Sequence, residues 1–417
     1  MKQSVPATSV SSHTTLDLFN EVRHLHPNLR FGGEPPDAIL TLPDELIRYI
    51  LALLSETPHP PPEVSPDKWT KLITTLKSHW VLPLVYWHAG HVPEKMRPPR
   101  EVMDALRGSF QWSRIRTLHM TRQLLQLTAA FREAGVRMIV LKGPALSRMV
   151  YPDSALRPAS DLDILVHPKE MTRSKEILAQ LGYTCDAIKF GTDVEALNHH
   201  EEYTSSEGGQ QFRSIELHWK LIRIGILQKT DVGQFFDNAV LVSAESSTFE
   251  ALHPVDALIH RALNNAFMHD GDMRLIWIYD ILMLARSFKE PYDWRLLQER
   301  CVAWRARLAV EVALTLARSW YGLHVPDAYA DFSTWPAPSA EELDAWGRIT
   351  SRRKRLDLMI GANLPHGSSL LKRVWMTIRL IVPPRAVVVN LYPVKHPWLF
   401  PLAYIRRWGK WINELRA

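Results

Sequence analysis

Two aspartates alternate with apolar residues where residues 160–166 read SDLDILV. In a strand, residues two apart lie on the same face, so Asp161 and Asp163 point the same way while the apolar residues pack on the opposite side. Two carboxylates side by side repel each other unless a cation lies between them, and a divalent metal that also binds a triphosphate is a common solution. An Asp-x-Asp pair is frequent by chance, so a strand-end pair that faces water stays an equal alternative for this segment alone.

A strand-to-helix turn precedes the acidic pair. The apolar run 138–141 ends in Lys142 and Gly143, and Pro144 suits the first turn of a helix. Glycine lets a phosphate approach the backbone closely, the free amides at a helix start favour an anion, and Lys142 adds a positive charge. The alternative is an ordinary turn with an exposed lysine. Beside the acidic pair, the turn indicates nucleotide binding by Lys142 and Gly143.

A third acidic candidate lies in residues 214–219, which read SIELHW. Alternation puts the three apolar residues on one face and Glu216 and His218 on the other. If this strand lies beside the first, three carboxylates can hold the paired metals of an in-line phosphoryl displacement, with one metal on the triphosphate and the other on the attacking hydroxyl. The alternative for Glu216 is an exposed strand acid. Its competitors for the third position are Asp186, Glu201 and Glu202.

Arg157 and Ser160 lie in the segment that leads to the acidic strand. Arg157 either contacts the triphosphate, which we favour, or pairs with Asp153 or Asp161. Ser160 is a further nucleotide-binding candidate. His200 and His218 are candidates for orienting the acceptor.

Two other groups of polar residues have plainer interpretations. Residues 199–202 read HHEE, but consecutive histidines in a strand or loop diverge and no cysteine joins them, so a zinc site is the less favoured interpretation. Asp280 and Arg274 are most simply a buried or half-buried ion pair that fixes two helices. A role of this region in nucleotide or acceptor binding is the alternative.

The periodicity of the chain changes twice. Residues 1–36 are rich in Ser, Thr, Gly and Pro and predict a flexible leader. Apolar spacing predicts helices over 37–135, including a long helix that ends at Gly135 and directs Leu118, Leu124, Leu125, Leu127 and Phe131 toward a core. Short strands and helices are predicted over 136–250, with strands at 183–190 and 211–219 among them, and helices again over 251–417. The predicted fold class is therefore α+β, with a small mixed sheet between N- and C-terminal helical regions.

Composition limits the class of protein. A chain of 417 residues with 46% hydrophobic and 23% charged residues is globular and too long for one ordinary core. Only two cysteines are present, which favours a reducing cytoplasm. No run of about 18 uncharged apolar residues predicts a membrane-spanning helix.

The formal charge of +6 fits nucleotides, phosphates or anionic lipid, so peripheral membrane contact stays open, but it is too mild and too spread out to indicate nucleic-acid binding. The basic run 352–355 is interpreted as a solvated helix face.

The sequence resembles a known group of enzymes. The segment 138–166, with its Lys-Gly turn, Tyr151, Arg157 and the aspartate pair, is similar to the DNA polymerase β nucleotidyltransferase superfamily. It resembles more closely a nucleotidyltransferase family of bacterial exopolysaccharide and lasso-peptide gene clusters, whose pattern continues with an acid followed by Leu-His-Trp, as at 216–219. Residues 274–281, the run IVPP at 381–384 and YIRR at 404–407 also match, so the similarity covers about residues 40–410. The chain departs from the superfamily at Pro144, where Gly or Ser is usual, and at Glu216, which is often Asp.

This resemblance implies a polymerase β-like core and transfer of a nucleotidyl group from a nucleoside triphosphate to a hydroxyl or phosphate acceptor. It implies Mg²⁺ or Mn²⁺ bound by Asp161, Asp163 and Glu216, and a role in bacterial polysaccharide or peptide biosynthesis. The acceptor would be a small molecule, a peptide or a protein. The alternatives are a nucleotide-binding scaffold without turnover and a toxin–antitoxin nucleotidyltransferase that modifies RNA or protein. The intact acidic trio argues against the first, and the long helical arms argue mildly against the second.

Overall fold

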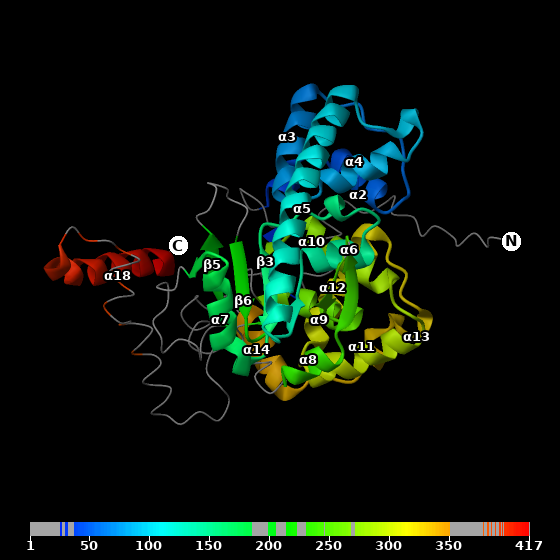
Figure 1. Cartoon of the computed structure of the whole chain (residues 1–417). Coiled ribbons are helices and arrows are strands. Elements are labelled where there is room, and N and C mark those ends of the chain that lie inside the picture. Colours follow the sequence, from blue (N-terminus) through cyan, green and yellow to red (C-terminus); the bar gives the residue numbers. More distant parts are fainter. Residues whose placement is uncertain are drawn as a thin grey trace.

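The structure is a computed structural model that describes residues 37–185, 199–205, 214–222, 231–245, 247–267, 272–350 and 396–416, together with residues 26, 30–31, 378, 382, 385, 388, 392 and 394. In these parts of the chain the centre is a seven-stranded mixed sheet with the strand order β4-β5-β6-β3-β2-β8-β7. Helices surround the sheet (Figure 1). The predicted α+β fold class is confirmed.

The strands of the sheet are β2 (Met138–Val140), β3 (Leu162–Val166), β4 (Tyr183–Cys185), β5 (His200–Ser205), β6 (Ser214–His218), β7 (Val240–Ala244) and β8 (Ser247–Ala251). Strand β3 pairs with β2 in antiparallel and with β6 in parallel orientation, and β5 pairs antiparallel with the other side of β6. Two short strands, β1 (Arg30–Phe31) and β9 (Asp272–Met273), form a separate parallel pair.

The helices are α2 (Asp44–Leu54), α3 (Pro66–Ser78), α4 (Leu82–Gly90), α5 (Arg100–Glu133), α6 (Pro144–Val150), α7 (Met171–Gln180), α8 (Gly233–Asp237), α9 (Pro254–Phe267), α10 (Leu275–Arg286), α11 (Tyr292–Ala303), α12 (Arg307–Tyr321), α13 (Asp327–Ala330), α14 (Ala340–Thr350) and α18 (Phe400–Arg416). The long helix α5 runs from the N-terminal helices across the sheet (Figure 1). It ends where the sequence predicts, because Gly135 adopts a left-handed conformation with φ of 70° just beyond it.

Each face of the sheet packs on a different set of helices because the side chains of β3 alternate. Leu162, Ile164 and Val166 pack in one core with α5 and α7. Leu165 lies in a second core, which α9, α10 and α12 share with the N-terminal helices α2 and α4. Asp163, which shares the face of Leu165, therefore faces the helices of the C-terminal half.

Five residues of α5 are predicted to face the core, and the prediction is right for three of them and wrong for Leu118. Leu124, Leu127 and Phe131 are buried, and Leu125 is half-buried, whereas Leu118 is 65% exposed. The row of buried residues continues toward the N-terminus of α5 as far as Met120. Leu118 lies two residues before Met120, and in a helix with 3.6 residues per turn this places it on the opposite side.

Several other predictions fall outside the described residues. They are most of the leader 1–36, the end of the predicted strand 183–190 with Asp186, the start of the predicted strand 211–219, the basic run 352–355 and most of the run 381–384. None of the helices in the described part of the chain combines the length and apolarity that crossing a bilayer requires.

A buried carboxylate joins the sheet region to the C-terminal helices. Asp280 of α10 is fully buried and accepts hydrogen bonds from Arg157 Nε (3.2 Å), Arg157 Nη2 (2.9 Å) and the hydroxyl of Tyr151 (2.7 Å). Arg261 Nη2 of α9 lies 3.2 Å from the same carboxylate. The sequence correctly predicts that Asp280 is in an ion pair, but its partners are Arg157 and Arg261. The guanidinium of Arg274 instead lies over the rings of Trp80 and Trp277.

Replacing Asp280 with asparagine should strongly destabilise the protein. The substitution leaves two buried guanidinium groups without a compensating charge, and breaking a buried pair in this way costs about 3–5 kcal/mol. Urea unfolding of Asp280→Asn should show this loss. The matched control is Glu56→Gln, because Glu56 forms an exposed pair with Arg286 of the same helix and should change stability by less than about 1 kcal/mol. Equal, small losses in both variants would contradict a structural role for Asp280.

Candidate active site

The acidic residues meet across β3 and its parallel neighbour β6. The register sets Asp163 directly beside Glu216, so the two carboxylates share one face, and Asp161 precedes β3 by one residue. The conditional prediction that residues 214–219 lie beside the acidic strand is confirmed. Strand β5 adds Glu202, which lies opposite Glu216. Glu201 lies on the other face of β5, where its carboxylate accepts hydrogen bonds from Lys175 Nζ and from the hydroxyl of Tyr203.

Two cationic groups converge on Asp163, whose side chain is fully buried. Lys142 Nζ lies 2.9 Å from Asp163 Oδ1. His218 Nε2 lies 3.3 Å from the same oxygen and 3.2 Å from Glu216 Oε2. The second oxygen, Asp163 Oδ2, is buried and accepts no hydrogen bond. An orphaned carboxylate oxygen next to a second carboxylate is a fitting ligand for a divalent cation.

The charges of the cluster shift one another's pKa values. Burial alone would raise the pKa of Asp163, but Lys142 and His218 hold it well below its usual range. Burial and the negative charge of Asp163 raise the pKa of Glu216 to about 7. The same two causes raise the pKa of Asp161. One lysine and one histidine therefore stabilise one carboxylate, while the other two are disfavoured as anions without a further cation.

The cations of the cluster respond in the opposite direction. Burial lowers the pKa of the Lys142 ammonium, but the charges of Asp163, Glu216 and Asp161 outweigh it and raise the pKa overall. Burial also lowers the pKa of His218, and its hydrogen bonds to Asp163 and Glu216 more than reverse this. Both side chains are therefore held in their positive form by the acids that they contact.

A glycine brings Lys142 to the acidic strand. Gly143, which precedes the first residue of α6, has φ of 59° and ψ of −113°, a conformation that side chains strongly disfavour. A Cβ at this position would lie 3.2 Å from the Cβ of Ala159 and 3.5 Å from the carbonyl oxygen of Asp161. Since the backbone of Leu141 also donates to the carbonyl of Asp163 at 3.0 Å, the turn lies directly against the acidic strand.

The remaining predicted residues are distributed around this cluster. Ser160 is half-buried and immediately precedes Asp161. Arg157 is 7% exposed and pairs with Asp280, not with Asp153 or Asp161. His200 lies opposite His218 in the sheet.

Helices contribute two residues whose positions have no local signal in the sequence. His260 of α9 is 3% exposed, and its pKa falls to about 3 because of burial first and the charge of nearby Lys142 second. Arg116 of α5 is half-buried, and although burial lowers its pKa, the charge of Asp161 opposes this shift. Both lie far from the acidic strand along the chain, so only the packing of α5 and α9 on the sheet brings them to the cluster.

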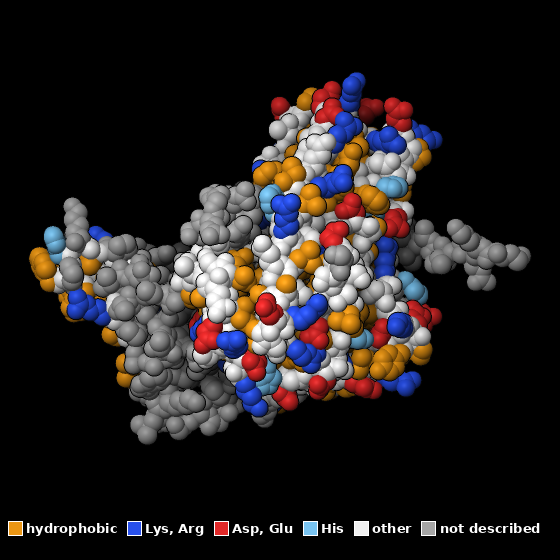
Figure 2. Space-filling model, viewed as in Figure 1, with side chains coloured by type: hydrophobic (Ala, Val, Ile, Leu, Met, Phe, Trp, Pro, Cys, Tyr) orange, Lys and Arg blue, Asp and Glu red, His pale blue; other side chains and the backbone are white. Residues whose placement is uncertain are grey.

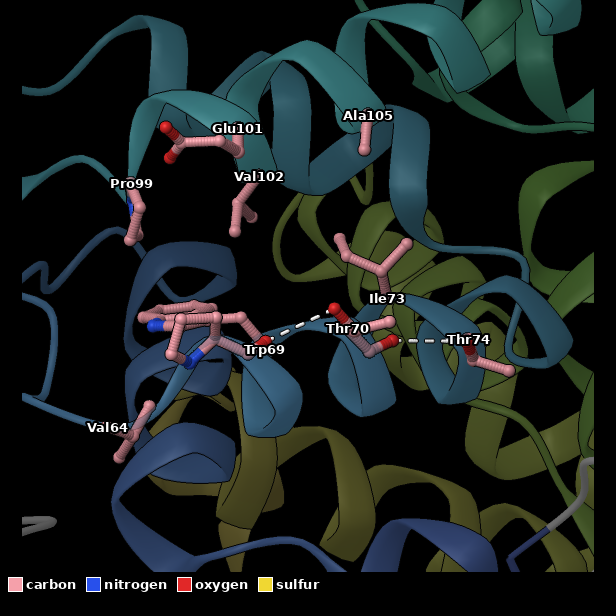
Figure 3. Close-up of a pocket in the computed structure, with 10 residues that line it drawn as sticks. Val64, Trp69, Thr70, Ile73, Thr74, Pro99, Glu101, Val102 and Ala105 are labelled. Carbon is pink, nitrogen blue, oxygen red and sulfur yellow. Dashed lines mark hydrogen bonds between the residues drawn. The ribbon is translucent and has the colours of Figure 1, made fainter.

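A separate pocket of about 610 Å³ lies between α3 and the start of α5. Figure 3 shows Trp69, Thr70 and Ile73 of α3 facing Glu101 and Val102 of α5 across it. Its lining is mainly apolar and includes none of the acidic, lysine or histidine residues of the cluster. The predicted nucleotide-binding residues Lys142, Gly143, Arg157 and Ser160 lie in the segment between β2 and β3 and do not line this pocket.

A mixed sheet with carboxylates on adjacent strands beside a lysine–glycine turn is the arrangement of a nucleotidyl-transferring enzyme. The chain belongs to the family described as uncharacterised nucleotidyltransferase, whose model matches residues 65–322, more than half of the chain. The matched range contains the acidic cluster, the Lys142–Gly143 turn and Asp280. No curated protein matches the chain.

Gly143→Ala should destabilise the protein more than the same change at another glycine with positive φ. A side chain at Gly143 meets both a strained backbone and the neighbouring Ala159, so we expect a loss of about 2–3 kcal/mol in the free energy of unfolding. Gly135→Ala is the control, because Gly135 has φ of 70° with nothing within 4 Å of its added Cβ, and should cost about 1 kcal/mol. Guanidinium unfolding measures both, and equal losses would mean that the turn does not need the close approach.

Proposed function

We propose that this nucleotidyltransferase moves a nucleotidyl group from a nucleoside triphosphate to a hydroxyl or phosphate acceptor with the aid of Mg²⁺ or Mn²⁺. The acceptor oxygen attacks the α-phosphorus, the bond to the β-phosphate oxygen breaks, and pyrophosphate leaves. The observation that carries the proposal is the in-register pair of Asp163 and Glu216 on parallel strands, with Asp161 beside it and Asp163 Oδ2 orphaned.

The three carboxylates have separate roles in this proposal. Asp161 and Asp163 hold the metal-bound triphosphate, and Glu216 serves the acceptor side. The divalent metals supply charge neutralisation of the phosphates and a lower pKa of the acceptor hydroxyl. Lys142 limits the repulsion between the acids through its contact with Asp163, and it can turn toward a phosphate when metal takes over that task.

The neighbours of the acids complete the proposal. Gly143 allows phosphate to approach the backbone, and Ser160 lies at the start of the acidic segment. We propose that Arg157 acts on the nucleotide through the position of its loop, since Asp280 occupies its guanidinium. His200 and His218 lie beyond Glu216 on β5 and β6 and are the proposed acceptor-side residues.

The acceptor is the substrate that receives the nucleotidyl group. The resemblance to a family of bacterial biosynthetic gene clusters supports a small molecule or a peptide of such a pathway. Mass spectrometry of candidate acceptors after incubation with labelled nucleoside triphosphate and Mg²⁺ would identify it.

A metal-bound nucleotide should stabilise the protein far more than nucleotide alone. A ligand that binds only the folded state raises its stability by mass action, by about 2.7 kcal/mol at a concentration of 100 Kd. Thermal melting should therefore show a clear rise with nucleoside triphosphate and Mg²⁺ and a much smaller rise with nucleotide and chelator. Equal shifts under both conditions would remove the case for a carboxylate-held cation.

Glu216→Gln should separate nucleotide binding from transfer. The variant keeps the shape of the side chain but removes one charge, so we expect near-normal nucleotide binding and turnover reduced by about 10²-fold, or about 2.7 kcal/mol of transition-state stabilisation. Asp163→Asn should lose both binding and transfer. Glu202→Gln is the matched control, because Glu202 lies opposite Glu216 on the neighbouring strand and should retain transfer. Full activity of Glu216→Gln with loss in Glu202→Gln would mean that the third acid is misassigned.

Peripheral contact with an anionic membrane is a second part of the proposal, which α18 supports. Trp398, Leu402 and Ile405 at and near the start of this helix are 72%, 44% and 59% exposed. Figure 1 shows α18 standing away from the sheet, and Figure 2 shows hydrophobic and basic side chains next to each other on it. An amphipathic helix with apolar and basic sides is suited to the surface of an anionic bilayer.

Sedimentation with vesicles tests this contact. The parent protein should sediment with vesicles that contain anionic lipid and not with neutral ones, and Ile405→Asp should reduce this fraction severalfold. Leu241→Asp is the control, because Leu241 on β7 is also an exposed apolar residue, at 73%. Binding that survives Ile405→Asp, or that falls equally in the control, would argue against α18 as the contact.

A further inference from the structure

Three histidines come together at the ends of β5 and β6. His200 begins β5 and lies opposite His218, which ends β6, while His199 directly precedes β5. The ring centroids are 4.3 Å apart for His199 and His200, 4.9 Å for His200 and His218, and 5.2 Å for His199 and His218. The sequence-based expectation that the two consecutive histidines diverge is therefore wrong. His199 stands outside the strand alternation, and the backbone amide of Trp219 donates to its carbonyl at 3.0 Å, which holds it at the end of β6.

The histidine nitrogens are arranged as metal ligands would be. One nitrogen from each of the three rings lies within 4.8 Å of the others. Ligands of a tetrahedral ion with metal–nitrogen bonds of about 2.0–2.1 Å are separated by about 3.4 Å, so small side-chain rotations suffice. Glu202 and Glu216 form a second such group with His200, so carboxylate ligands are available beside the three nitrogens.

Two of the three histidines are buried, unlike most histidines at a protein surface. His199 is 6% and His218 is 3% exposed. Nε2 of His218 contacts the carboxylates of Asp163 and Glu216, while its Nδ1 is buried and has no hydrogen-bond partner. A buried polar atom without a partner costs free energy unless a ligand satisfies it. The Nε2 proton of His218, which points to Asp163 and Glu216, can stay in place while Nδ1 binds a metal, so only the Nδ1 proton has to leave.

The donor atoms indicate which cation this would be. Mg²⁺ prefers oxygen ligands, and the carboxylate pair Asp163 and Glu216 offers those. Imidazole nitrogens favour transition metals such as Zn²⁺ and Co²⁺. We propose that His199, His200 and His218 bind a divalent transition metal at a site that borders the carboxylate cluster and shares His218 with it. The inference assigns a further role to His200 and His218, but it does not rest on the proposed transfer reaction, because it depends on the nitrogen donors and not on the triphosphate site.

Cobalt binding tests the site directly. The full chain, without a histidine tag and after treatment with a chelator, is titrated with Co²⁺ while its visible absorption is recorded, and Zn²⁺ affinity is measured by calorimetry. We expect one Co²⁺ with the intense bands of a four- or five-coordinate nitrogen site, displaced by Zn²⁺ but not by millimolar Mg²⁺. A weak octahedral spectrum, or displacement by Mg²⁺, would overturn the proposal.

Three variants locate the metal. His199→Ala should lower Co²⁺ and Zn²⁺ affinity by more than about 100-fold, because residues that only orient a ligand already contribute about 10–100-fold. His91→Ala removes an exposed histidine that directly follows α4, and this variant should bind both metals like the parent. Asp163→Asn should also keep the Co²⁺ spectrum, since Asp163 contacts Nε2 of His218 and leaves the buried Nδ1 available to the metal. Unchanged binding in His199→Ala, or loss of binding in Asp163→Asn, would contradict a metal site whose ligands are the three histidines.

Two further measurements distinguish a lost metal ligand from a folding defect and from a failure of the proposed transfer function. Thermal melting of metal-free His199→Ala should match that of the metal-free parent, which excludes a folding defect as the cause of lost binding. The stabilisation by nucleotide and Mg²⁺ should persist in His199→Ala, because this residue is not among the proposed nucleotide ligands. If the parent binds Co²⁺ as expected but shows no response to nucleotide and Mg²⁺, the proposed transfer function fails and the histidine site stands.

Discussion

Repulsion between neighbouring carboxylates is the constraint around which this part of the molecule is organised. Asp163 is fully buried and lies beside Glu216 in the sheet, an arrangement that two unpaired anions would not tolerate. Lys142 and His218 both contact Asp163 and compensate part of its charge. The tight turn at Gly143 places Lys142 beside Asp163, and the parallel pairing of β3 with β6 places His218 beside it. The compensation is incomplete, since Glu216 and Asp161 still have raised pKa values. A further cation would therefore stabilise the ionised forms of Glu216 and Asp161.

The helices make this arrangement rigid and restrict its exposure to water. The acidic face of the sheet lies toward the core that α9, α10 and α12 build with the N-terminal helices. Asp280 stabilises this packing, because it forms ion pairs with Arg157 from the loop before β3 and with Arg261 from α9. The same α9 carries His260, whose neutral imidazole lies near Lys142. The loop before β3 and the helices α9 and α10 are thus linked through one buried ionic network.

The sequence predicts the elements of the site better than their contacts. Alternation in SDLDILV and SIELHW assigns Asp163 and Glu216 to strand faces correctly, and the glycine between Lys142 and Pro144 correctly predicts a strand-to-helix turn. Helical periodicity identifies α5 and its end at Gly135, yet it misplaces Leu118, because two overlapping apolar rows are present and only packing selects one. Arg157 and Asp280 are both recognisable as polar residues in unusual places. That they bind each other could not be read from residues 123 positions apart.

The sequence by itself determined the fold class, the strand faces and the chemical types available for catalysis. These properties depend on local rules, since side chains alternate in strands and glycine permits conformations that other residues avoid. Only the tertiary structure decided which strand lies beside which, that Glu216 and not Glu201 shares the face of Asp163, and that His199, His200 and His218 converge. Such contacts join segments far apart in the chain, and they are selected by the burial of whole faces against α5, α7 and α9. No spacing within one segment contains that information.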